Sequence, residues 1–368
     1  MGKIKILMFL NSMNPAGGIE RVVANLANNL SEDYEITILV KDEATSFYEL
    51  KDKINVISLN VPLKLNMNSR IQRLFSLIIN LLITNNRLKT YTRSFVFDYI
   101  YVTSPFNALE VFLCGKCNAR KLVISEHGSK FAYNKIYKIL KKKLYPKAYK
   151  ISVPTTMDTY SYINEGSDAV YIPHLSTFSV VPGNNLNSKI VLNIGRLTSD
   201  KQQLMLLEIW NELRKENRLN GWKLKIVGKG EEEVNLRNFI YCNNLQDCVE
   251  ISPPVKDVGK LYINASLFAF TSKFEGFGMV LLEAMSFGLP CISFDCPSGP
   301  RDLIEHKLNG VLIKPYDYEE YKDELSLLLN DRNDYLTSLG NEARLFALNW
   351  NNENITNKWK EIFRGDLT

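Results

Sequence analysis

The sequence predicts an α/β fold of two doubly wound domains, each a parallel sheet covered by helices, that face a common cleft. The 368 residues are too many for one compact core and comfortable for two. A composition of 45% apolar and 23% charged residues is that of an ordinary globular protein. Short apolar runs alternate with helix-length amphipathic segments twice along the chain, and this alternation favours parallel sheets.

The elements follow in order along the chain. Apolar runs predict the strands of a first sheet at 3–10, 35–40, 54–59, 98–104, 121–127 and 150–155. Further runs predict a second sheet at 188–197, 222–230, 248–254, 266–272, 290–295 and 310–315. Amphipathic segments predict helices at 18–30 and 204–216.

Between the two halves, residues 175–189 are rich in Ser, Asn, Pro and Gly, which indicates a linker. We therefore expect Rossmann-like domains at 1–174 and 190–351, with a C-terminal helix at 352–368 that packs back on the first domain.

Neither a disulfide framework nor a metal site is expected. The six cysteines are irregularly spaced, and Cys114 and Cys117 form a CxxC without a second pair or a nearby histidine. Free thiols are favoured over a zinc or redox centre. The apolar core of the N-terminal stretch, at 6–10, is too short for a secretory signal, and no run of 18 apolar residues occurs.

The stretch from Ser272 to Pro290 carries two carboxylates, Glu275 and Glu283, around two glycines. It follows a predicted strand, so the glycines and the helix N-terminus after Gly278 would present bare N–H groups at the cleft. The alternative is a capping carboxylate and one exposed helix acid. The helix is so apolar, however, that it has little exposed face to spare for Glu283.

Three further strand ends carry candidate residues, each of which is ambiguous alone. Arg196 and Lys201 could grip a diphosphate, or be two solvated surface cations. Gly17-Gly18 before a helix could admit an anion, although it is not GxGxxG and is more often a simple turn. His127 could contact a ligand, although a lone histidine is more often structural. Together these groups suit a ligand with a diphosphate and two hydroxyl-rich ends.

The order of these motifs resembles glycosyltransferase family 4, whose members are retaining enzymes of the GT-B fold. The matching segments are Gly17-Gly18 with "IERV", Gly195-Arg196-Leu197 with Lys201, "KIVGKGEEE", "EGFGMVLLEAMSFGLPCIS", "PSGPRDLI" and "NGVLI". They cover nearly the whole chain, and the Glu-x7-Glu segment is the most specific of them.

The resemblance implies a role for each candidate on the donor side. Arg196 and Lys201 would bind the donor diphosphate and stabilise the charge that grows as it leaves. The N–H groups of Gly278, Met279 and Val280 would assist them. Glu283 would accept hydrogen bonds from the ribose hydroxyls.

The resemblance also implies roles at the transferred sugar. Glu275 would contact its hydroxyls, His127 would lie beside it near the reaction centre, and the Gly17-Gly18 loop would close on the phosphate and acceptor side. The donor would be a nucleotide sugar, with UDP expected from the habit of the family. Two departures leave the nucleotide base less defined: "VGKGEEE" lacks the proline that often follows its second glycine, and His174 stands in place of asparagine. Gln202 also follows Lys201, where glycine or asparagine is common.

The paired carboxylates also invite a glycosidase interpretation, with a nucleophile and an acid. The resemblance argues against it, since one carboxylate is assigned to the ribose. Retention in the family is usually attributed to front-face attack, in which the leaving phosphate oxygen takes the acceptor proton. The chain has no Asp-x-Asp, so neither a metal nor a cofactor is expected, and Arg196 with Lys201 would replace the metal's charge.

Positive charge gathers in two segments, although the net charge is only +5. Residues 130–150 hold eight lysines and no acid, and residues 64–93 hold six basic residues and no acid around an apolar run at 74–83. The second segment is typical of a helix that lies in a membrane interface. We expect both to contact an anionic membrane surface, with the protein peripheral on the cytoplasmic face of the cell membrane. The alternative is a core helix and a solvated basic face.

The expected acceptor is therefore a lipid-diphosphate-linked saccharide of bacterial surface polysaccharide or glycan assembly. Lipid-linked oligosaccharide enzymes of the family also carry Ser-Glu-His at the place of Ser125-Glu126-His127. A soluble sugar or another lipid is the alternative acceptor. From other classes, a nucleic-acid binder that uses the lysines and a catalytically silent sugar-nucleotide binder stay open. We expect no nucleic-acid partner, because no recognised module accompanies the lysines.

Overall fold

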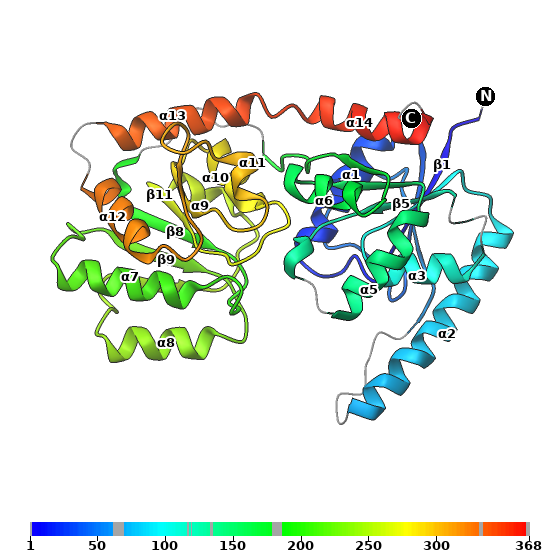
Figure 1. Cartoon of the computed structure of the whole chain (residues 1–368), viewed down its shortest axis with the longest axis horizontal. Helices are drawn as coiled ribbons and strands as arrows, with labels where there is room; N and C mark the ends of the chain where they lie inside the picture. The colour runs from blue at the N-terminus through cyan, green and yellow to red at the C-terminus, as the bar shows by residue number, and fades with distance from the viewer. Residues whose placement is uncertain are drawn as a thin grey trace. The chain divides into compact units, whose positions relative to one another are not determined.

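The computed structural model describes residues 2–61, 70–115, 118, 120–132, 135–178, 186–330 and 334–365. The chain divides into two compact units: unit 1 comprises Met1–Leu175 and Asn352–Thr368, and unit 2 comprises Ser176–Asn351. Each unit is a parallel sheet with helices on both faces (Figure 1). The predicted fold class is thereby confirmed.

Unit 1 is built on a seven-stranded sheet in the order β3-β2-β1-β4-β5-β6-β7. The strands are β1 Lys5–Leu10, β2 Glu35–Val40, β3 Asn55–Ser58, β4 Tyr99–Val102, β5 Leu122–Ser125, β6 Lys150–Val153 and β7 Ala169–Tyr171. Residues 6–10 of β1 are fully buried, as expected of a central parallel strand with helices on both faces. The strand order reverses beside β1, which places the switch point of the sheet between the ends of β1 and β4.

The helices of unit 1 are α1 Gly18–Leu30, α2 Arg70–Ser94, α3 Pro105–Leu113, α5 Lys135–Leu144, α6 Thr156–Asn164 and α14 Asn352–Arg364. The last of these comes from the C-terminus and lies against unit 1 (Figure 1). Trp359 packs edge-on to Tyr101 and Phe363 to Tyr34, while Lys360 forms an ion pair with Asp33 at 2.5 Å. Aromatic burial of this kind is what holds a distant segment to a domain.

Unit 2 is built on a six-stranded sheet in the order β10-β9-β8-β11-β12-β13. Its strands are β8 Ile190–Ile194, β9 Lys223–Val227, β10 Val249–Ser252, β11 Leu267–Phe270, β12 Cys291–Phe294 and β13 Val311–Ile313. Its helices are α7 Gln203–Lys215, α8 Glu233–Cys242, α9 Gly259–Ile263, α10 Met279–Ser286, α11 Pro300–Leu303, α12 Tyr318–Leu329 and α13 Tyr335–Leu348. The order reverses between β8 and β11, so the loops that follow these two strands meet at the switch point.

The stretch at 175–189 is more than a connection. Phe178 packs edge-on against Phe287 of unit 2, with ring centroids 5.1 Å apart, and also contacts Tyr262. Residues 186–188 form a short 3-10 helix, and 179–185 lie outside the described residues. The described residues on either side of this gap, 176–178 and 186–189, therefore belong to unit 2.

Among the described helices, none is both long enough and apolar enough to cross a bilayer. The longest, α2, packs its C-terminal half on the core through Leu88 and Tyr91. Its N-terminal half extends away from unit 1 and exposes Ile78, Ile79 and Leu82 (Figure 1).

Candidate functional site

The loop after β8 is held by two glycines of the neighbouring loop. A Cβ on Gly228 would lie 1.9 Å from the carbonyl oxygen of Gly195, and a Cβ on Gly230 would lie 2.2 Å from that of Leu197. Only glycine allows the two backbones to approach this closely. The "KIVGKG" motif therefore fixes the backbone that presents Arg196 and Lys201.

Arg196 and Lys201 differ in their surroundings. The Arg196 side chain is 74% exposed, and its contact with Asp200 is long, at 3.9 Å. Lys201 is largely enclosed and forms an ion pair with Glu275, which is likewise enclosed. Two predicted site residues that are far apart in the sequence thus meet at the switch point of unit 2.

The loop after β11 positions Glu275 through several hydrogen bonds. The hydroxyl of Ser272 donates to its Oε1 at 2.8 Å, and its backbone N–H donates to the Pro297 carbonyl at 2.9 Å. The Thr271 hydroxyl donates to the Lys201 carbonyl at 2.9 Å, which joins the two loops. Ser272 is a site residue that was not predicted, although its place at the end of a strand beside the motif was a signal that it would lie there.

The N-terminus of α10 opens beside this pair. Gly278 is the N-cap residue and has φ 88° and ψ 49°, the left-handed region that favours glycine. The first N–H groups of a helix, here those of Met279 and Val280, have no acceptor within the helix, and the helix dipole makes this end attractive to an anion. This helix end, Lys201 and Arg196 are therefore the groups of the two loops whose charge suits an anion such as a phosphate.

Glu283 lies deeper than its neighbours. It is 2% exposed, and its Oε2 accepts a hydrogen bond from the Tyr262 hydroxyl at 2.8 Å. Tyr262 stacks on Phe287, with ring centroids 5.3 Å apart. This tyrosine was not predicted, and nothing in its sequence surroundings would have indicated its contact with Glu283. That Glu283 accepts hydrogen bonds from a ribose stays a prediction.

In unit 1, His127 follows β5 and stacks on His174, with centroids 5.1 Å apart and an angle of 18° between the rings. Burial lowers the pKa of His174 to about 4. Burial, and then the nearby His174, lowers the pKa of His127 well below its usual value. The Nε2 atom of His127 is shielded from solvent and has no hydrogen-bond partner among the described residues. A nitrogen of a neutral imidazole can donate or accept one hydrogen bond, depending on the tautomer, so this atom could bond to a sugar hydroxyl.

The loop before α1 carries an acid that the predictions overlooked. Gly17 is the N-cap residue, and a Cβ on it would lie 2.1 Å from a carboxylate oxygen of Glu20. Burial raises the pKa of Glu20. The Gly17-Gly18 turn is thus covered on one side by a carboxylate of its own helix, and its role towards phosphate stays a prediction.

One expectation about the basic segment at 130–150 was wrong. Lys141, expected with the other lysines of the segment at the membrane surface, is only 4% exposed and forms a buried ion pair with Glu126. The helical period explains this, because Tyr137, Lys141 and Leu144 share the inner face of α5. Lys138, Lys142 and Lys143 are exposed beside Ile136 and Ile139, so the outer face is basic and apolar. Residues 64–69 of the other basic segment lie outside the described residues.

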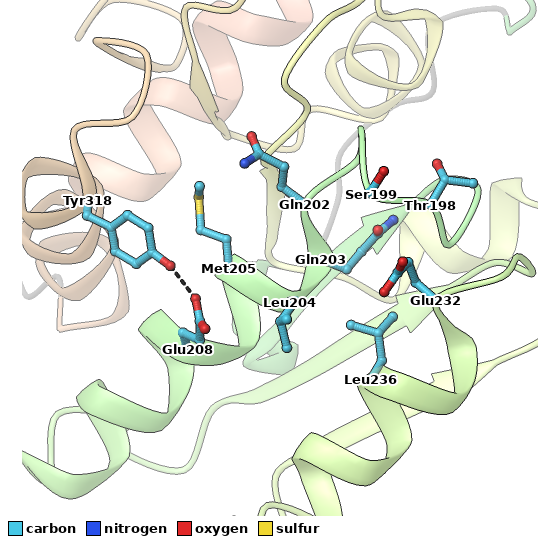
Figure 2. Close-up of a pocket in the computed structure, with 10 residues that line it drawn as sticks. All are labelled: Thr198, Ser199, Gln202, Gln203, Leu204, Met205, Glu208, Glu232, Leu236 and Tyr318. Atoms are coloured by element: carbon cyan, nitrogen blue, oxygen red, sulfur yellow. Dashed lines mark hydrogen bonds between the residues drawn. The ribbon is translucent and has the colours of Figure 1, made fainter.

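Unit 2 also contains a pocket of about 320 Å³ against the loop after β8 (Figure 2). Thr198, Ser199 and Gln202 line one part of it, and the Tyr318 hydroxyl donates a hydrogen bond to Glu208 at another. None of the predicted site residues lines it. Among the described residues, no three His, Cys, Asp or Glu side chains are placed to hold a metal ion, and Cys117 of the CxxC lies outside them.

The predicted residues thus fall into two sets. Unit 2 brings together Lys201, Glu275 and the N-terminus of α10, with Arg196 on the same loop and Glu283 inside the helix. Unit 1 holds the other set: Gly17 and Gly18 lie at the start of α1, and His127 lies in the loop after β5.

Comparisons with known proteins identify the class of protein to which the chain belongs. The model of the family described as "Glycosyl transferases group 1" matches residues 177–346, which contain the unit 2 set. An uncharacterized glycosyltransferase of Haemophilus influenzae is 30% identical over 376 residues, covering 97% of this chain and 99% of that protein. The chain therefore belongs to the glycosyltransferases.

Other relatives are similar over their full length. The amylovoran biosynthesis glycosyltransferase AmsD of Erwinia amylovora is 28% identical, covering 97% of this chain and 99% of that protein. A Campylobacter jejuni N-acetylgalactosaminyltransferase, named as acting on a saccharide linked to undecaprenol diphosphate, is 27% identical, covering 98% of each.

Among solved structures, Staphylococcus aureus TarM in a complex that includes UDP superposes with a TM-score of 0.80 at 16% identity, covering 98% of this chain and 99% of that one. The fold is GT-B, which confirms the fold that the resemblance implied.

Proposed function

We propose that this glycosyltransferase is a retaining, metal-independent enzyme of family 4. It transfers a hexose or an N-acetylhexosamine from a UDP-sugar to a lipid-diphosphate-linked saccharide during bacterial surface polysaccharide or glycan assembly. The observation that carries the proposal is the Lys201–Glu275 pair beside the N-terminus of α10 in unit 2.

The positive charges of unit 2 support the binding of a donor diphosphate. The exposed guanidinium of Arg196 and the ammonium of Lys201 match a diphosphate, Arg through a planar fork and Lys as a point charge. As the bond between the sugar and the phosphate breaks, negative charge grows on the phosphate oxygens, and fixed cations with helix N–H groups stabilise it. UDP is supported by its presence in the TarM complex.

The carboxylate of Glu275 supports the contact with the transferred sugar. Its enclosed carboxylate, held by Lys201 and Ser272, can accept hydrogen bonds from sugar hydroxyls. In front-face transfer the acceptor oxygen bonds to the anomeric carbon on the face that the phosphate leaves. The leaving phosphate oxygen takes the acceptor proton, so no protein base is required, and His127 contributes a hydrogen bond rather than a proton.

The acceptor side is supported by two surfaces of unit 1. The outer face of α5 places exposed lysines beside Ile136 and Ile139, and α2 exposes Ile78, Ile79 and Leu82. Apolar side chains with adjacent cations suit the interface of an anionic membrane, where a lipid-linked acceptor resides. The C. jejuni relative, named for such an acceptor, supports this reading. The protein would be peripheral on the cytoplasmic face.

The test is transfer with EDTA present, using a panel of UDP-sugars, polyprenyl-diphosphate saccharides and soluble sugars. We expect one donor to react in EDTA with the lipid-linked acceptor, and the product to keep the anomeric configuration of the donor by NMR. An inverted product, or activity only with added metal, would refute the mechanism. Equal use of a soluble acceptor would refute the lipid assignment.

A further inference from the structure

Unit 1 contains a buried group of charged and phenolic side chains immediately before His127. Glu126 is 1% exposed and Lys141 is 4% exposed. Burying two charges costs several kcal/mol each unless their hydrogen bonds are satisfied. The buried Glu126–Lys141 pair lies next in sequence to His127, a predicted site residue.

The hydrogen bonds of the Glu126 carboxylate come from three side chains. The Tyr145 hydroxyl donates to Oε1, and Lys141 donates to Oε2. Tyr162 also donates to Oε2, at 2.9 Å, and its own hydroxyl accepts a hydrogen bond from Lys141 at 2.9 Å. The Lys141 ammonium lies 5.5 Å from the ring centroids of both tyrosines, within cation–π range. Burial lowers the pKa of Lys141, and the neighbouring Glu126 opposes this shift.

These contacts join the His127 loop to several elements at once. The Glu126 N–H donates to the Ser152 carbonyl of β6 at 2.9 Å. Its side chain reaches α5 through Lys141 and α6 through Tyr162. At the other end of the loop, the Lys130 N–H donates to Asp158 of α6 at 3.0 Å. His127 lies between these two anchors.

The outer face of α5, the helix that carries Lys141, is exposed. Ile136 and Ile139 of α5 are 61% and 55% exposed, and exposed Lys142 adjoins them. One face of α5 is thus the proposed membrane surface, and the opposite face holds the residue that precedes His127.

We propose that Lys141 is a positioning residue that, by holding the Glu126 carboxylate, fixes the loop of His127 to α5. This inference rests on the proposed function, in which His127 contacts the transferred sugar. A displacement of about 1 Å at a site can cost ~100-fold in rate, so a charged clamp next to the contact residue affects the chemical step without touching substrate.

If the Glu126–Lys141 pair only stabilised the fold, replacing it would have a different effect. Replacing a buried ion pair with neutral side chains of similar volume is often neutral or stabilising. The double variant Glu126→Gln/Lys141→Met removes both charges of the pair together, and Tyr145→Phe removes a single hydrogen bond to Glu126. The matched control is Lys150→Met, because Lys150 has a 5% exposed side chain paired with Asp168. Lys150 begins β6, so it lies at the end of that strand opposite to the end that holds Glu126.

The experiment measures kcat for transfer, calorimetric affinity for UDP, and NMR spectra of the histidine rings in the full chain. We expect the double variant and Tyr145→Phe to lower kcat by ~10-fold or more, with UDP affinity within about twofold of the unsubstituted protein. The chain has three histidines, and we expect the His127 signals to move while those of His306 stay. Lys150→Met should change none of these quantities.

A folded double variant with kcat within about twofold of the unsubstituted protein and unmoved His127 signals would overturn the inference. An equal loss of kcat in Lys150→Met would also overturn it. If the double variant does not fold, Tyr145→Phe decides. If the unsubstituted protein transfers no sugar from any donor, the proposed function fails, and the His127 signals still test the positioning.

Discussion

At the scale of single residues, the Lys201–Glu275 pair defines the proposed chemistry. Both side chains are largely enclosed, at 17% and 14% exposure, yet they lie at the switch point, where ligands of such sheets bind. A donor sugar that enters would share Glu275 with Lys201, while the phosphate takes the lysine. In the proposed reaction, the two partners of this ion pair would take separate roles once the donor binds.

Glu275→Gln should lower the rate of transfer by at least ~100-fold, because it removes a charged contact to the sugar, while UDP affinity changes little. Lys201→Ala should abolish turnover as well, since it removes charge from the leaving diphosphate. Glu250→Gln is the matched control, as Glu250 pairs with Lys225 at 3.0 Å on β10 and β9. Ordinary activity in a folded Glu275→Gln protein would remove Glu275 from the site.

The stacked histidines make stability depend on pH. The unfolded chain binds a proton on each imidazole near pH 6.5, whereas burial lowers the folded pKa of His174 to about 4. Between these values the unfolded state binds more protons, so the free energy of unfolding falls as the pH drops from 6.5 to 4. The full shift of His174 is worth roughly 3 kcal/mol.

His174→Asn should therefore flatten the decline of the melting temperature between pH 6.5 and 4.5. His306→Asn is the control, because His306 is exposed and lies in unit 2. A decline as steep in His174→Asn as in the unsubstituted protein would show that this imidazole is not buried in its neutral form.

At the scale of elements, two loops are fixed by close backbone packing. Gly230→Ala should destabilise unit 2 by about 1–3 kcal/mol, because its Cβ would lie 2.2 Å from the Leu197 carbonyl oxygen. UDP affinity should fall with it, since the loop of Arg196 and Lys201 must shift. Thermal unfolding and calorimetry check both effects, and an unchanged melting temperature would contradict the packing.

The outer face of α5 should bind anionic membranes. Changing Lys138, Lys142 and Lys143 to serine should weaken flotation with anionic vesicles, since each lysine near such a surface contributes ~1 kcal/mol. UDP affinity should not change. A control triple variant replaces the exposed lysines 215, 223 and 260 of unit 2. Equal losses in the two triple variants would contradict a specific membrane face on α5.

Local patterns in the sequence predict the elements and the residues at strand ends, because strand alternation, glycine turns and the helical period are local properties. The helical period places Lys141 on the same face as Tyr137 and Leu144, but the count of lysines alone assigned all of them to the membrane surface. The contacts of Tyr262 with Glu283, and of Tyr145 and Tyr162 with Glu126, join distant segments. They depend on tertiary packing that a single sequence does not encode locally.

At the scale of the whole molecule, the chain carries its candidate groups in two separate compact units. The residues that we propose to contact the diphosphate and the sugar belong to unit 2, whereas His127 and the basic outer face of α5 belong to unit 1. This division fits a reaction in which one domain holds the donor and the other meets the acceptor. The net charge of +5 matters less than its location on unit 1.

The central claim is that Lys201, rather than a metal, neutralises the donor diphosphate. Calorimetric binding of UDP in EDTA, to the unsubstituted protein, Lys201→Met and the control Lys225→Met, tests it most directly. We predict binding without metal, a loss of at least ~10-fold in affinity for Lys201→Met, and no change for Lys225→Met. Binding that requires added metal, or an unchanged affinity in folded Lys201→Met, would contradict the account.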